Sequence, residues 1–303
     1  MDKKYLFIIN PVAGKGKTAH LIDRLQKLID KLKIEYKIIK TEFSRQIDSI
    51  VESNKSLFNR FVVVGGDGTV HDLVNSKSIA DIVCGVIPTG SGNDFAMALK
   101  MEKDIEKNLS IIIMDNFSKI DIGIAEIVNQ DGTISTHTFA NSVGIGFDAA
   151  VAAGARRIKF LSGLPLYLAS VFKNLISYKM TEFQICADDF SYSDTVFMVA
   201  IENGKTAGGG FRLTPHAELD DGLLDYSLIK KINKIKAVIN LLPKAIIGKH
   251  INNKSVIYKK TRQLDIFVKS PLYVHADGEI LTDSLKRIKI SLLPKTLNII
   301  SNR

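Results

Sequence analysis

The sequence predicts a two-domain protein, with an α/β domain of parallel strands followed by a mostly antiparallel β domain. Its 303 residues exceed the usual length of one domain, which is about 100–200 residues. Strand-like and helix-like patterns alternate in the first part of the chain, which is typical of a parallel sheet covered by helices. From about residue 121, short runs of alternating polar and apolar residues indicate antiparallel strands. We therefore expect an α/β domain at residues 1–120 and a β domain at residues 121–303.

The elements of the first domain follow from local patterns. Residues 5–9 form a short apolar run that ends at the turn signal Asn10-Pro11, which indicates a strand. Residues 18–32 carry apolar side chains at the spacing of one helical face. The same reasoning predicts further strands at 36–39, 61–64 and 83–87 and further helices at 44–53, 69–75 and 93–99.

The second domain differs in texture, because short alternating runs replace the long periodic segments. These runs predict strands at residues 121–127, 136–142, 183–187, 195–201, 223–229, 264–268 and 288–292. Two helical insertions, at residues 149–180 and 234–247, interrupt the strands. No low-complexity linker separates the domains, and we expect the C-terminal strand to return toward the first domain.

The composition is that of an ordinary globular protein. Hydrophobic residues make up 46% and charged residues 24% of the chain, which excludes a disordered chain, a collagen and a coiled coil. Cys84, Cys186 and six scattered histidines form neither a disulfide framework nor a spaced zinc site, which favours a reducing compartment. Neither a signal peptide nor a run of about 18 apolar residues stands out. We expect a cytoplasmic protein, either soluble or peripheral at the inner face of the membrane.

Positive charge is concentrated in the second domain. The net charge is +9, and residues 226–264 hold ten bases and no acid, from Lys230 to Arg262. A second acid-free stretch, at residues 149–181, holds Arg156, Arg157, Lys159, Lys173 and Lys179. Such patches attract anionic partners, which include nucleic acids, acidic lipid headgroups and phosphorylated metabolites. A solvated surface that only keeps the protein soluble is the alternative.

Three glycine-bearing loops follow strands of the first domain, at residues 10–16, 65–69 and 88–94. The carboxyl ends of parallel strands meet at one edge of a sheet, and glycines there let backbone N–H groups approach a phosphate. One such loop would be weak support, because most are simply turns, but three at successive strand ends favour nucleotide or phosphate binding. The loops are neither a Walker A motif, which would have glycine at Pro11, nor a dinucleotide fingerprint, which would have glycine at Phe95.

Motifs spread over nearly the whole chain occur in an order that points to one family. They are Asn10-Pro11, Gly65-Gly66-Asp67-Gly68-Thr69, Gly90-Ser91-Gly92-Asn93-Asp94-Phe95, Asn141-Ser142-Val143-Gly144-Ile145-Gly146-Phe147-Asp148, Gly208-Gly209-Gly210, Leu219-Asp220-Asp221-Gly222 and Asp277-Gly278-Glu279. This set resembles the diacylglycerol kinase catalytic family, which includes bacterial lipid kinases and sphingosine kinases. The chain departs from the family at His71-Asp72, where Asn-Glu is usual, at Ser91, where threonine is common, and in the lead-in Val274-His275-Ala276.

The resemblance implies an N-terminal Rossmann-like domain of the NAD kinase and diacylglycerol kinase type, a C-terminal antiparallel β-sandwich, and a nucleotide cleft between them. More distantly, the loop at residues 65–69 also resembles that of NAD kinases. ATP would be held by the backbone of the glycine loops, with hydroxyls from Thr41, Thr69 and Ser91. The cofactor-binding residues that we expect are Asn10, Pro11, Val12, Ala13, Gly14, Thr41, Gly65, Gly66, Asp67, Gly68, Thr69, Val70, His71 and Ser91.

Acidic residues at two motifs are candidates for the chemistry itself. Asp67 is suited to hold catalytic Mg²⁺ by its carboxylate or through water, because Mg²⁺ prefers oxygen ligands; a turn-capping aspartate is the alternative. An alcohol needs a base within hydrogen-bond reach to accept its proton. By resemblance Asp277 is that base, with Glu279 next in line, whereas by itself the Asp-Gly-Glu sequence indicates only a hairpin turn.

The acidic run at residues 218–223 resembles the structural metal site of the family. In that site the carboxylate of Asp221 and the backbone carbonyls of Glu218 and Leu223 would bind Mg²⁺. A tight acidic turn suits such a hard cation. A plain Asp-Asp-Gly turn is the alternative.

The resemblance therefore implies an ATP- and Mg²⁺-dependent lipid kinase that transfers the γ-phosphoryl group to a lipid hydroxyl, with diacylglycerol as the first choice. Sphingoid bases, ceramide and polyprenols remain open as acceptors. An NAD kinase or soluble-alcohol kinase, and a nucleotide-binding regulator without turnover, are the alternatives outside lipid kinases. No nucleic-acid partner is expected, because the bases come without aromatic stacking platforms. Family members often pair, so a homodimer stays open.

An anionic membrane surface is a further expected partner. Residues 156–179 interleave bases with apolar residues, so this segment could lie in a membrane interface with its bases toward anionic headgroups. An ordinary helix that buries its apolar face against its own sheet is the alternative. The acid-free stretch at residues 226–264 would add electrostatic attraction.

Overall fold

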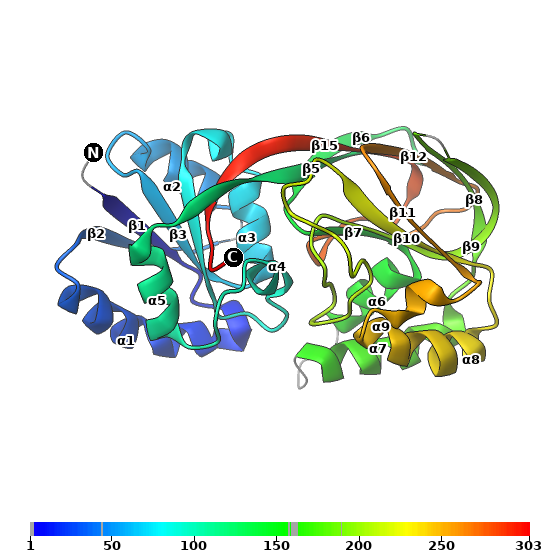
Figure 1. The fold of residues 1–303 in the computed structure, drawn as a ribbon, viewed down its shortest axis with the longest axis horizontal. Helices are drawn as coiled ribbons and strands as arrows, with labels where there is room; N and C mark the ends of the chain where they lie inside the picture. The colour runs from blue at the N-terminus through cyan, green and yellow to red at the C-terminus, as the bar shows by residue number, and fades with distance from the viewer. Residues whose placement is uncertain (1–2, 44, 157, 159–162, 189) are drawn as a thin grey trace. The chain divides into compact units, whose positions relative to one another are not determined.

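A parallel sheet forms the centre of the first part of the chain in the computed structural model (Figure 1). The structure describes residues 3–43, 45–156, 158, 163–188 and 190–303. The predictions at Arg157, Lys159, Phe160 and Leu161 therefore lie outside the described residues, as does the side chain of Leu164. The chain divides into unit 1, residues 1–120 with 295–303, and unit 2, residues 121–294.

Among the described strands, the sheet of unit 1 has a core of four strands that pair in parallel with one another. Its order is β2-β1-β3-β4, and the end of β15 joins the far edge beside β4. The strands are β1 (Lys4–Ile9), β2 (Glu35–Lys40), β3 (Arg60–Gly65), β4 (Val83–Pro88) and β15 (Leu285–Ile300). Four of these strands come from the apolar runs that the sequence singled out, and the predicted α/β class of this half is confirmed.

Helices cover both faces of this sheet, as Figure 1 shows, with α1 and α5 on one face and α2 and α3 on the other. The unit 1 helices are α1 (Lys17–Lys31), α2 (Ile47–Asn54), α3 (Asp67–Val74), α4 (Asp94–Ala98) and α5 (Ile105–Met114). Apolar residues of α1 and α5 pack on alternate residues of β1, which gives a buried core on that face. The helix α5 was not among the predicted elements, although Asp104 caps it by accepting the N–H groups of Glu106 and Lys107.

Unit 2 is built of antiparallel strands, as expected. They are β5 (Phe117–Asn129, which enters from unit 1), β6 (Ile134–Phe139), β7 (Ser142–Gly146), β8 (Thr181–Ala187), β9 (Phe190–Glu202), β10 (Leu224–Lys230), β11 (Val256–Thr261), β12 (Gln263–Val268), β13 (Val274–Ala276), β14 (Glu279–Thr282) and most of β15. The long strand β9 connects the unit: its first half pairs with β8, and its second half lies between β7 and β10. The single strand expected at 136–142 is wrong, because the chain turns between β6 and β7 at Ala140 and Asn141.

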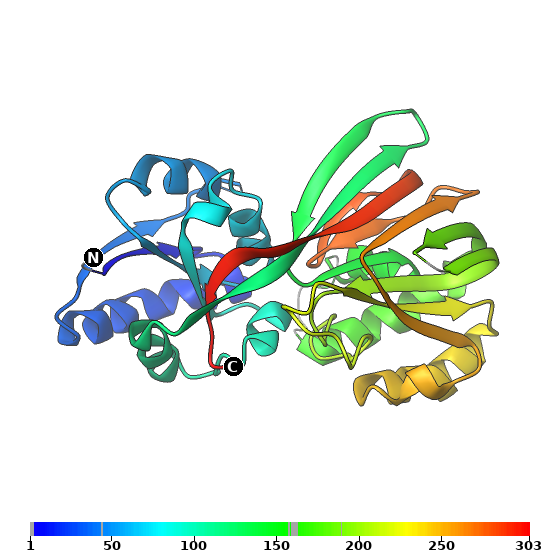
Figure 2. The same ribbon diagram turned by 45° about the horizontal axis from the view of Figure 1, so that its top comes forward.

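The helices of unit 2 lie together on one side of its strands in both ribbon views (Figures 1 and 2). They are α6 (Phe147–Ala155), α7 (Gly163–Ser177), α8 (Lys234–Lys236), the π-helical turn η3 (Ala237–Leu241) and α9 (Leu242–Ile246). Both predicted helical insertions are thus present, and the first holds two separate helices. Within the described residues, no helix combines the length and the apolar character that crossing a bilayer requires.

Candidate nucleotide and acceptor sites

The three glycine loops of unit 1 lie together at the carboxyl ends of β1, β3 and β4. A Cβ atom on Gly14 would lie 2.2 Å from the carbonyl oxygen of Thr89, and Gly14 has a φ of +59°, so this position requires glycine. A Cβ atom on Gly90 would lie 2.4 Å from the Cα atom of Gly66. The first loop therefore touches the third, and the third touches the second, through their backbones. This close approach is what brings several backbone N–H groups to one edge of the sheet.

Side-chain hydrogen bonds fix the loops to one another. The hydroxyl of Thr18, at the start of α1, lies 2.7 Å from the hydroxyl of Thr89. The amide of Asn10 donates to the hydroxyl of Thr69 at 3.0 Å, which ties the first loop to α3. Thr41 donates its N–H to the carbonyl of Ile9 at 2.8 Å and so stands beside the first loop. Thr18 and Thr89 were not among the predicted contacts, although Thr89 directly precedes Gly90 and Thr18 lies two residues after Gly16.

Asp67 joins the second loop to the third. Its carboxylate accepts the N–H of Asn93 at 2.7 Å and that of Phe95 at 3.4 Å, at the start of the short helix α4. These bonds are those of a capping aspartate, supplied here from a neighbouring loop. The role of Asp67 in holding Mg²⁺ stays a prediction.

The other expected nucleotide contacts differ in how their side chains are exposed. Val12 and Ser91 are exposed at the loop tips. Val70 and His71 are buried in α3, and their side chains belong to the core of unit 1. Contacts of these two residues with a nucleotide would have to go through their backbone.

Asp277 and Glu279 lie on the hairpin between β13 and β14 in unit 2. Asp277 is buried, and its carboxylate accepts three backbone N–H groups, from Ala140 at 3.0 Å and from Asn141 and Ser142 at 2.9 Å each. It therefore fastens the β6–β7 turn to this hairpin. Glu279 is more open, with 42% of its side chain exposed, and it pairs with Arg156 at 2.5 Å. The assignment of the base to Asp277, with Glu279 second, stays a prediction.

Lys260 occupies the acidic side of the turn where the resemblance implied Mg²⁺. Its ammonium lies 2.7 Å from Asp221 Oδ2 and 3.5 Å from the buried carboxylate of Asp225. Burial alone would lower the pKa of Lys260, but its hydrogen bond to Asp221 and the charge of Asp225 outweigh burial and raise that pKa. In the described part of the chain, no three His, Cys, Asp or Glu side chains come together as metal ligands. Binding of Mg²⁺ by Glu218, Asp221 and Leu223 stays a prediction that must compete with this lysine.

Replacing Lys260 with methionine is expected to make unit 2 responsive to Mg²⁺. The substitution leaves the carboxylate of Asp221 without its cation, so Mg²⁺ should raise the melting temperature of Lys260→Met more than that of the wild type. At a concentration of 100 times its Kd, the ion would stabilise the variant by about 2.7 kcal/mol. The measurement is thermal unfolding with Mg²⁺ and with a chelator.

The matched control is Lys259→Met, because Lys259 is exposed on the same strand and lies over the ring of Phe190 at 5.0 Å. This control should respond to Mg²⁺ as the wild type does. Equal stabilisation of wild type and Lys260→Met would mean that the ion binds despite the lysine. Absence of any response in Lys260→Met would exclude a cation site at this turn.

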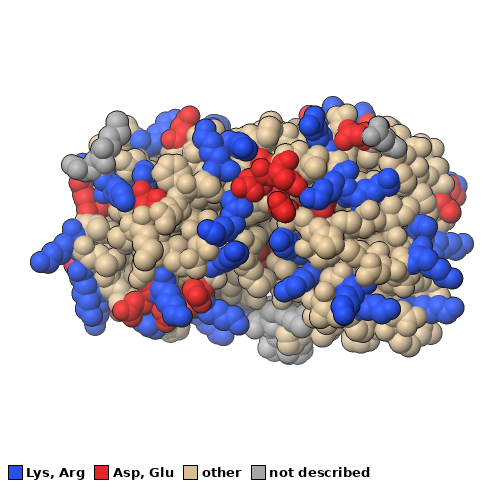
Figure 3. Space-filling view, in the orientation of Figure 1, with Lys and Arg blue, Asp and Glu red and all other residues tan. Residues whose placement is uncertain are grey.

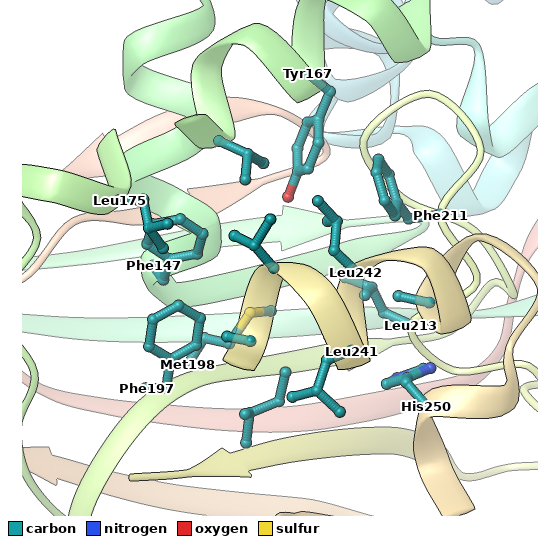
Figure 4. A pocket seen from close by; sticks show the side chains of 15 residues that line it. Phe147, Tyr167, Leu175, Phe197, Met198, Phe211, Leu213, Leu241, Leu242 and His250 are labelled. Atoms are coloured by element: carbon teal, nitrogen blue, oxygen red, sulfur yellow. The ribbon is translucent and has the colours of Figure 1, made fainter. Parts of the chain in front are cut away.

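An apolar cavity lies between the helices and the strands of unit 2 (Figure 4). Its empty volume is about 520 Å³, counted out to its open mouth. Its walls are Phe147, Tyr167, Val171, Leu175, Phe197, Met198, Phe211, Leu213, Ile229, Ala237, Val238, Leu241, Leu242, Ala245 and His250. Burial lowers the pKa of His250 to about 4, so its ring is neutral near pH 7. A cavity lined almost entirely by apolar side chains suits an apolar ligand.

Each of the two units matches a protein-family model. Residues 4–125 match the model of the diacylglycerol kinase catalytic domain, and residues 141–301 match that of the YegS C-terminal NAD kinase beta sandwich-like domain. The chain is 29% identical to a diacylglycerol kinase of Bacillus subtilis, over 73% of this chain and 71% of that protein. It is 28% identical to a diacylglycerol kinase of Staphylococcus aureus, over 92% and 87% of the two chains. A crystal structure titled as a diacylglycerol kinase from Bacillus anthracis has the same fold, with a TM-score of 0.73, 22% identity and coverage of 99% and 97%.

Proposed function

We propose that this chain, which belongs to the diacylglycerol kinase catalytic-domain family, is a lipid kinase. It transfers the γ-phosphoryl group of ATP to the hydroxyl of diacylglycerol, giving phosphatidic acid. The observation that carries the acceptor class is the apolar cavity of unit 2, whose almost entirely apolar lining suits an acyl chain. Two parts of the chemistry fall to different units: unit 1 binds the nucleotide, and unit 2 binds the lipid and carries the base.

The nucleotide is held by the glycine loops of unit 1. Backbone N–H groups from the loops after β1 and β3 contact the phosphates, because Gly14 and Gly66 leave no side chain between backbone and ligand. Hydroxyls of Thr41, Thr69 and Ser91 supply further donors. The Asp67 carboxylate fits Mg²⁺, which would neutralise phosphate charge when bound. The capping bonds to Asn93 and Phe95 hold that carboxylate in one orientation.

The acceptor hydroxyl gives its proton to a carboxylate of the β13–β14 hairpin. Asp277 is the first candidate for that base, and its three backbone hydrogen bonds fix its position. Glu279 is the second candidate, and its exposed carboxylate is held by Arg156. The acyl chain in the cavity keeps the lipid bound while its hydroxyl meets the nucleotide.

Labelled ATP and a panel of acceptors test this function directly. The purified protein is incubated with diacylglycerol, ceramide, a sphingoid base or a polyprenol in detergent micelles, and with NAD in the absence of lipid. We expect label in phosphatidic acid. Label on another lipid would correct the acceptor, and label on NAD would favour a soluble-substrate kinase. Binding of ATP with no label transferred to any acceptor would favour a regulator without turnover.

We propose further that unit 2 attaches to anionic membranes through the outer surface of its helices, which we call the apolar–basic face. Phe172 and Ile176 on α7 are exposed there, and so are Ile235, Ile239 and Ile247. The exposed lysines of this face are Lys173, Lys179, Lys231, Lys236, Lys244 and Lys249. Lys234 donates to the carbonyl of Ile176 at 3.0 Å, so the end of α7 lies beside α8.

The chemistry of this face suits a bilayer with anionic headgroups. Figure 3 shows Lys and Arg side chains and no acidic ones over the part of unit 2 where Figure 1 draws α8 and α9. Exposed isoleucines can enter the interface while the lysines stay at the headgroups. On α7, Val171 is buried toward the cavity, as in an ordinary helix that packs on its own sheet, whereas Phe172 and Ile176 face outward and are available for the proposed membrane contact.

Removing charge from the apolar–basic face is expected to weaken vesicle binding strongly. Each lysine near an anionic surface contributes about 1 kcal/mol, so replacing Lys231, Lys236, Lys244 and Lys249 with glutamine should lower affinity for phosphatidylglycerol vesicles by at least about a hundredfold. Sedimentation with vesicles measures it. The control replaces four exposed unit 1 lysines, Lys27, Lys31, Lys103 and Lys107, which changes net charge equally. An equal loss in both variants would mean a general charge effect, and unchanged binding would leave the face as solvated surface.

A further inference from the structure

A buried, hydrogen-bonded pair of titratable side chains, which the proposed function does not use, lies at the β13–β14 hairpin. His275 Nε2 is 2.8 Å from Asp148 Oδ2, and both side chains are almost completely buried. The other oxygen of Asp148 accepts a hydrogen bond from the hydroxyl of Tyr167. Burial alone would raise the pKa of Asp148, but its interactions with His275 and the hydrogen bond from Tyr167 outweigh burial and lower it. We call Tyr167, Asp148 and His275 the buried polar chain.

Two motif glycines make room for the buried polar chain. A Cβ atom on Gly144 would lie 2.1 Å from Asp148 Oδ2 and 2.3 Å from His275 Nε2. A Cβ atom on Gly208, whose φ is +62°, would lie 2.6 Å from the ring of Tyr167. Neither position can accept a side chain without displacing a member of the chain. Gly144 and Gly208, which belong to two separate motifs, thus leave space for the same three side chains.

One end of the buried polar chain is in the wall of the apolar cavity. Tyr167 descends from α7 among the cavity residues in Figure 4, and its ring centroid lies 4.8 Å from that of Phe211. Phe147, the neighbour of Asp148 at the start of α6, lines the same cavity. A ligand that fills the cavity therefore contacts the ring that carries the hydroxyl bonded to Asp148.

The other end of the buried polar chain is at the hairpin itself. His275 Nδ1 accepts the N–H of Gly278 at 3.4 Å, and the carbonyl of Gly278 accepts from Arg156 at 3.3 Å. A neutral imidazole with its proton on Nε2 satisfies both contacts of His275, since Nε2 donates to Asp148 while Nδ1 accepts. Gly278, which links Asp277 to Glu279, is thus bonded to His275 through its N–H and to Arg156 through its carbonyl.

We propose that His275 is a positioning residue for the Asp277–Glu279 hairpin, and that Tyr167 and Asp148 make its position depend on what fills the apolar cavity. The inference rests on the proposed function and goes beyond it, because it makes Tyr167 a determinant of acceptor specificity. A long acyl chain packs against Tyr167 and stabilises the bonds through Asp148 to His275. A short acyl chain leaves the ring less constrained, and the hairpin is then less well ordered for transfer.

Acceptor chain length in Tyr167→Phe tests the proposal. The substitution keeps the ring in the cavity wall and removes only the hydroxyl. In the wild type, kcat should be higher for dipalmitoylglycerol than for dioctanoylglycerol. In Tyr167→Phe, kcat for the long-chain acceptor should fall about tenfold, or about 1.4 kcal/mol, while its KM stays within about a factor of two. The preference for the long chain should then largely disappear; a preference equal to that of the wild type would overturn the proposal.

The matched control is Tyr178→Phe. Tyr178 is also buried, directly after the end of α7, but its hydroxyl donates to the carbonyl of Phe197 at 2.8 Å and not to the buried polar chain. It should lose comparable thermal stability and keep the chain-length preference. In addition, the double variant Tyr167→Phe with His275→Leu should lose no more kcat than His275→Leu alone, because both substitutions act through the buried polar chain. Losses that simply multiply would contradict the coupling.

A spectroscopic measurement separates failure of this inference from failure of the proposed function. If the wild type phosphorylates no lipid, the proposed function fails, but the ring ¹⁵N signals of His275 can still be recorded. They should indicate a proton on Nε2, and they should shift in Tyr167→Phe but not in Tyr178→Phe. Signals that are the same in all three proteins would overturn the buried polar chain as a coupled unit.

Discussion

Asp277→Asn is expected to lower the rate of phosphoryl transfer by about a thousandfold, within the range that a general base contributes. Asparagine keeps the shape of the side chain but does not accept the proton of the acceptor hydroxyl. The measurement is transfer of labelled phosphate to diacylglycerol under saturating ATP and lipid. Glu279→Gln, measured beside it, decides which carboxylate of the hairpin is the base, because only the base should show the full loss.

The same substitution is expected to destabilise unit 2, and this effect must be measured separately. Asp277 accepts backbone N–H groups from Ala140, Asn141 and Ser142. An asparagine would turn its NH₂ group toward one of these donors and leave it unsatisfied, at a cost of about 1–3 kcal/mol. Urea unfolding measures this cost. Activity is then compared under conditions in which both proteins are folded.

Asp283→Asn is the control for Asp277, because Asp283 is exposed at the turn between β14 and β15. It should retain wild-type transfer and stability. If Asp277→Asn loses stability but retains transfer while folded, Asp277 is structural only, and the proposed base is wrong.

Gly90→Ala is expected to weaken the binding of ATP by about a hundredfold, which corresponds to the loss of about one or two hydrogen bonds to the charged phosphates. The added methyl group would lie 2.4 Å from the Cα atom of Gly66 and 2.8 Å from the side-chain oxygen of Asn93. The second and third loops would have to separate, and their backbone N–H groups would no longer converge on the phosphates. Calorimetric titration with a non-hydrolysable ATP analogue gives the affinity.

Gly132→Asn is the control for Gly90. Gly132 has a φ of +86°, which asparagine tolerates better than other side chains, and a Cβ atom there meets no atom within 4 Å. It lies in the turn between β5 and β6 of unit 2 and belongs to none of the three glycine loops. It should bind the analogue as the wild type does. Unchanged affinity in Gly90→Ala would contradict the assignment of the loops to the nucleotide.

The fold of unit 1 could be predicted well because its signals are local. Strands buried on both faces read as continuous apolar runs, as at β3, and α1 shows the spacing of one apolar face. One predicted helix start was wrong, and the reason is local. The helix α3 begins at Asp67 rather than at Thr69, because it starts within the glycine motif itself.

Unit 2 was predicted less well because several of its boundaries depend on distant partners. The turn between β6 and β7 is held by the carboxylate of Asp277, which lies far along the chain. The residues near position 140 do not indicate this contact. The short strands β13 and β14 have too few residues to show an alternating pattern. Lys260 is one base among the ten of its stretch, and no local pattern marks it as the partner of Asp221.

Residue order alone determined which loops could approach a phosphate, which carboxylates were candidates for chemistry, and which of the two halves would be α/β and which β. Glycine positions and periodic apolar runs are properties of neighbouring residues, so they can be identified directly in one sequence. Tertiary structure alone decided what each candidate side chain touches: that Asp67 caps a neighbouring loop, that a lysine reaches Asp221, and that Tyr167, Asp148 and His275 meet behind the hairpin. These contacts join residues from separate elements, and only the packing of those elements brings such residues within hydrogen-bonding distance.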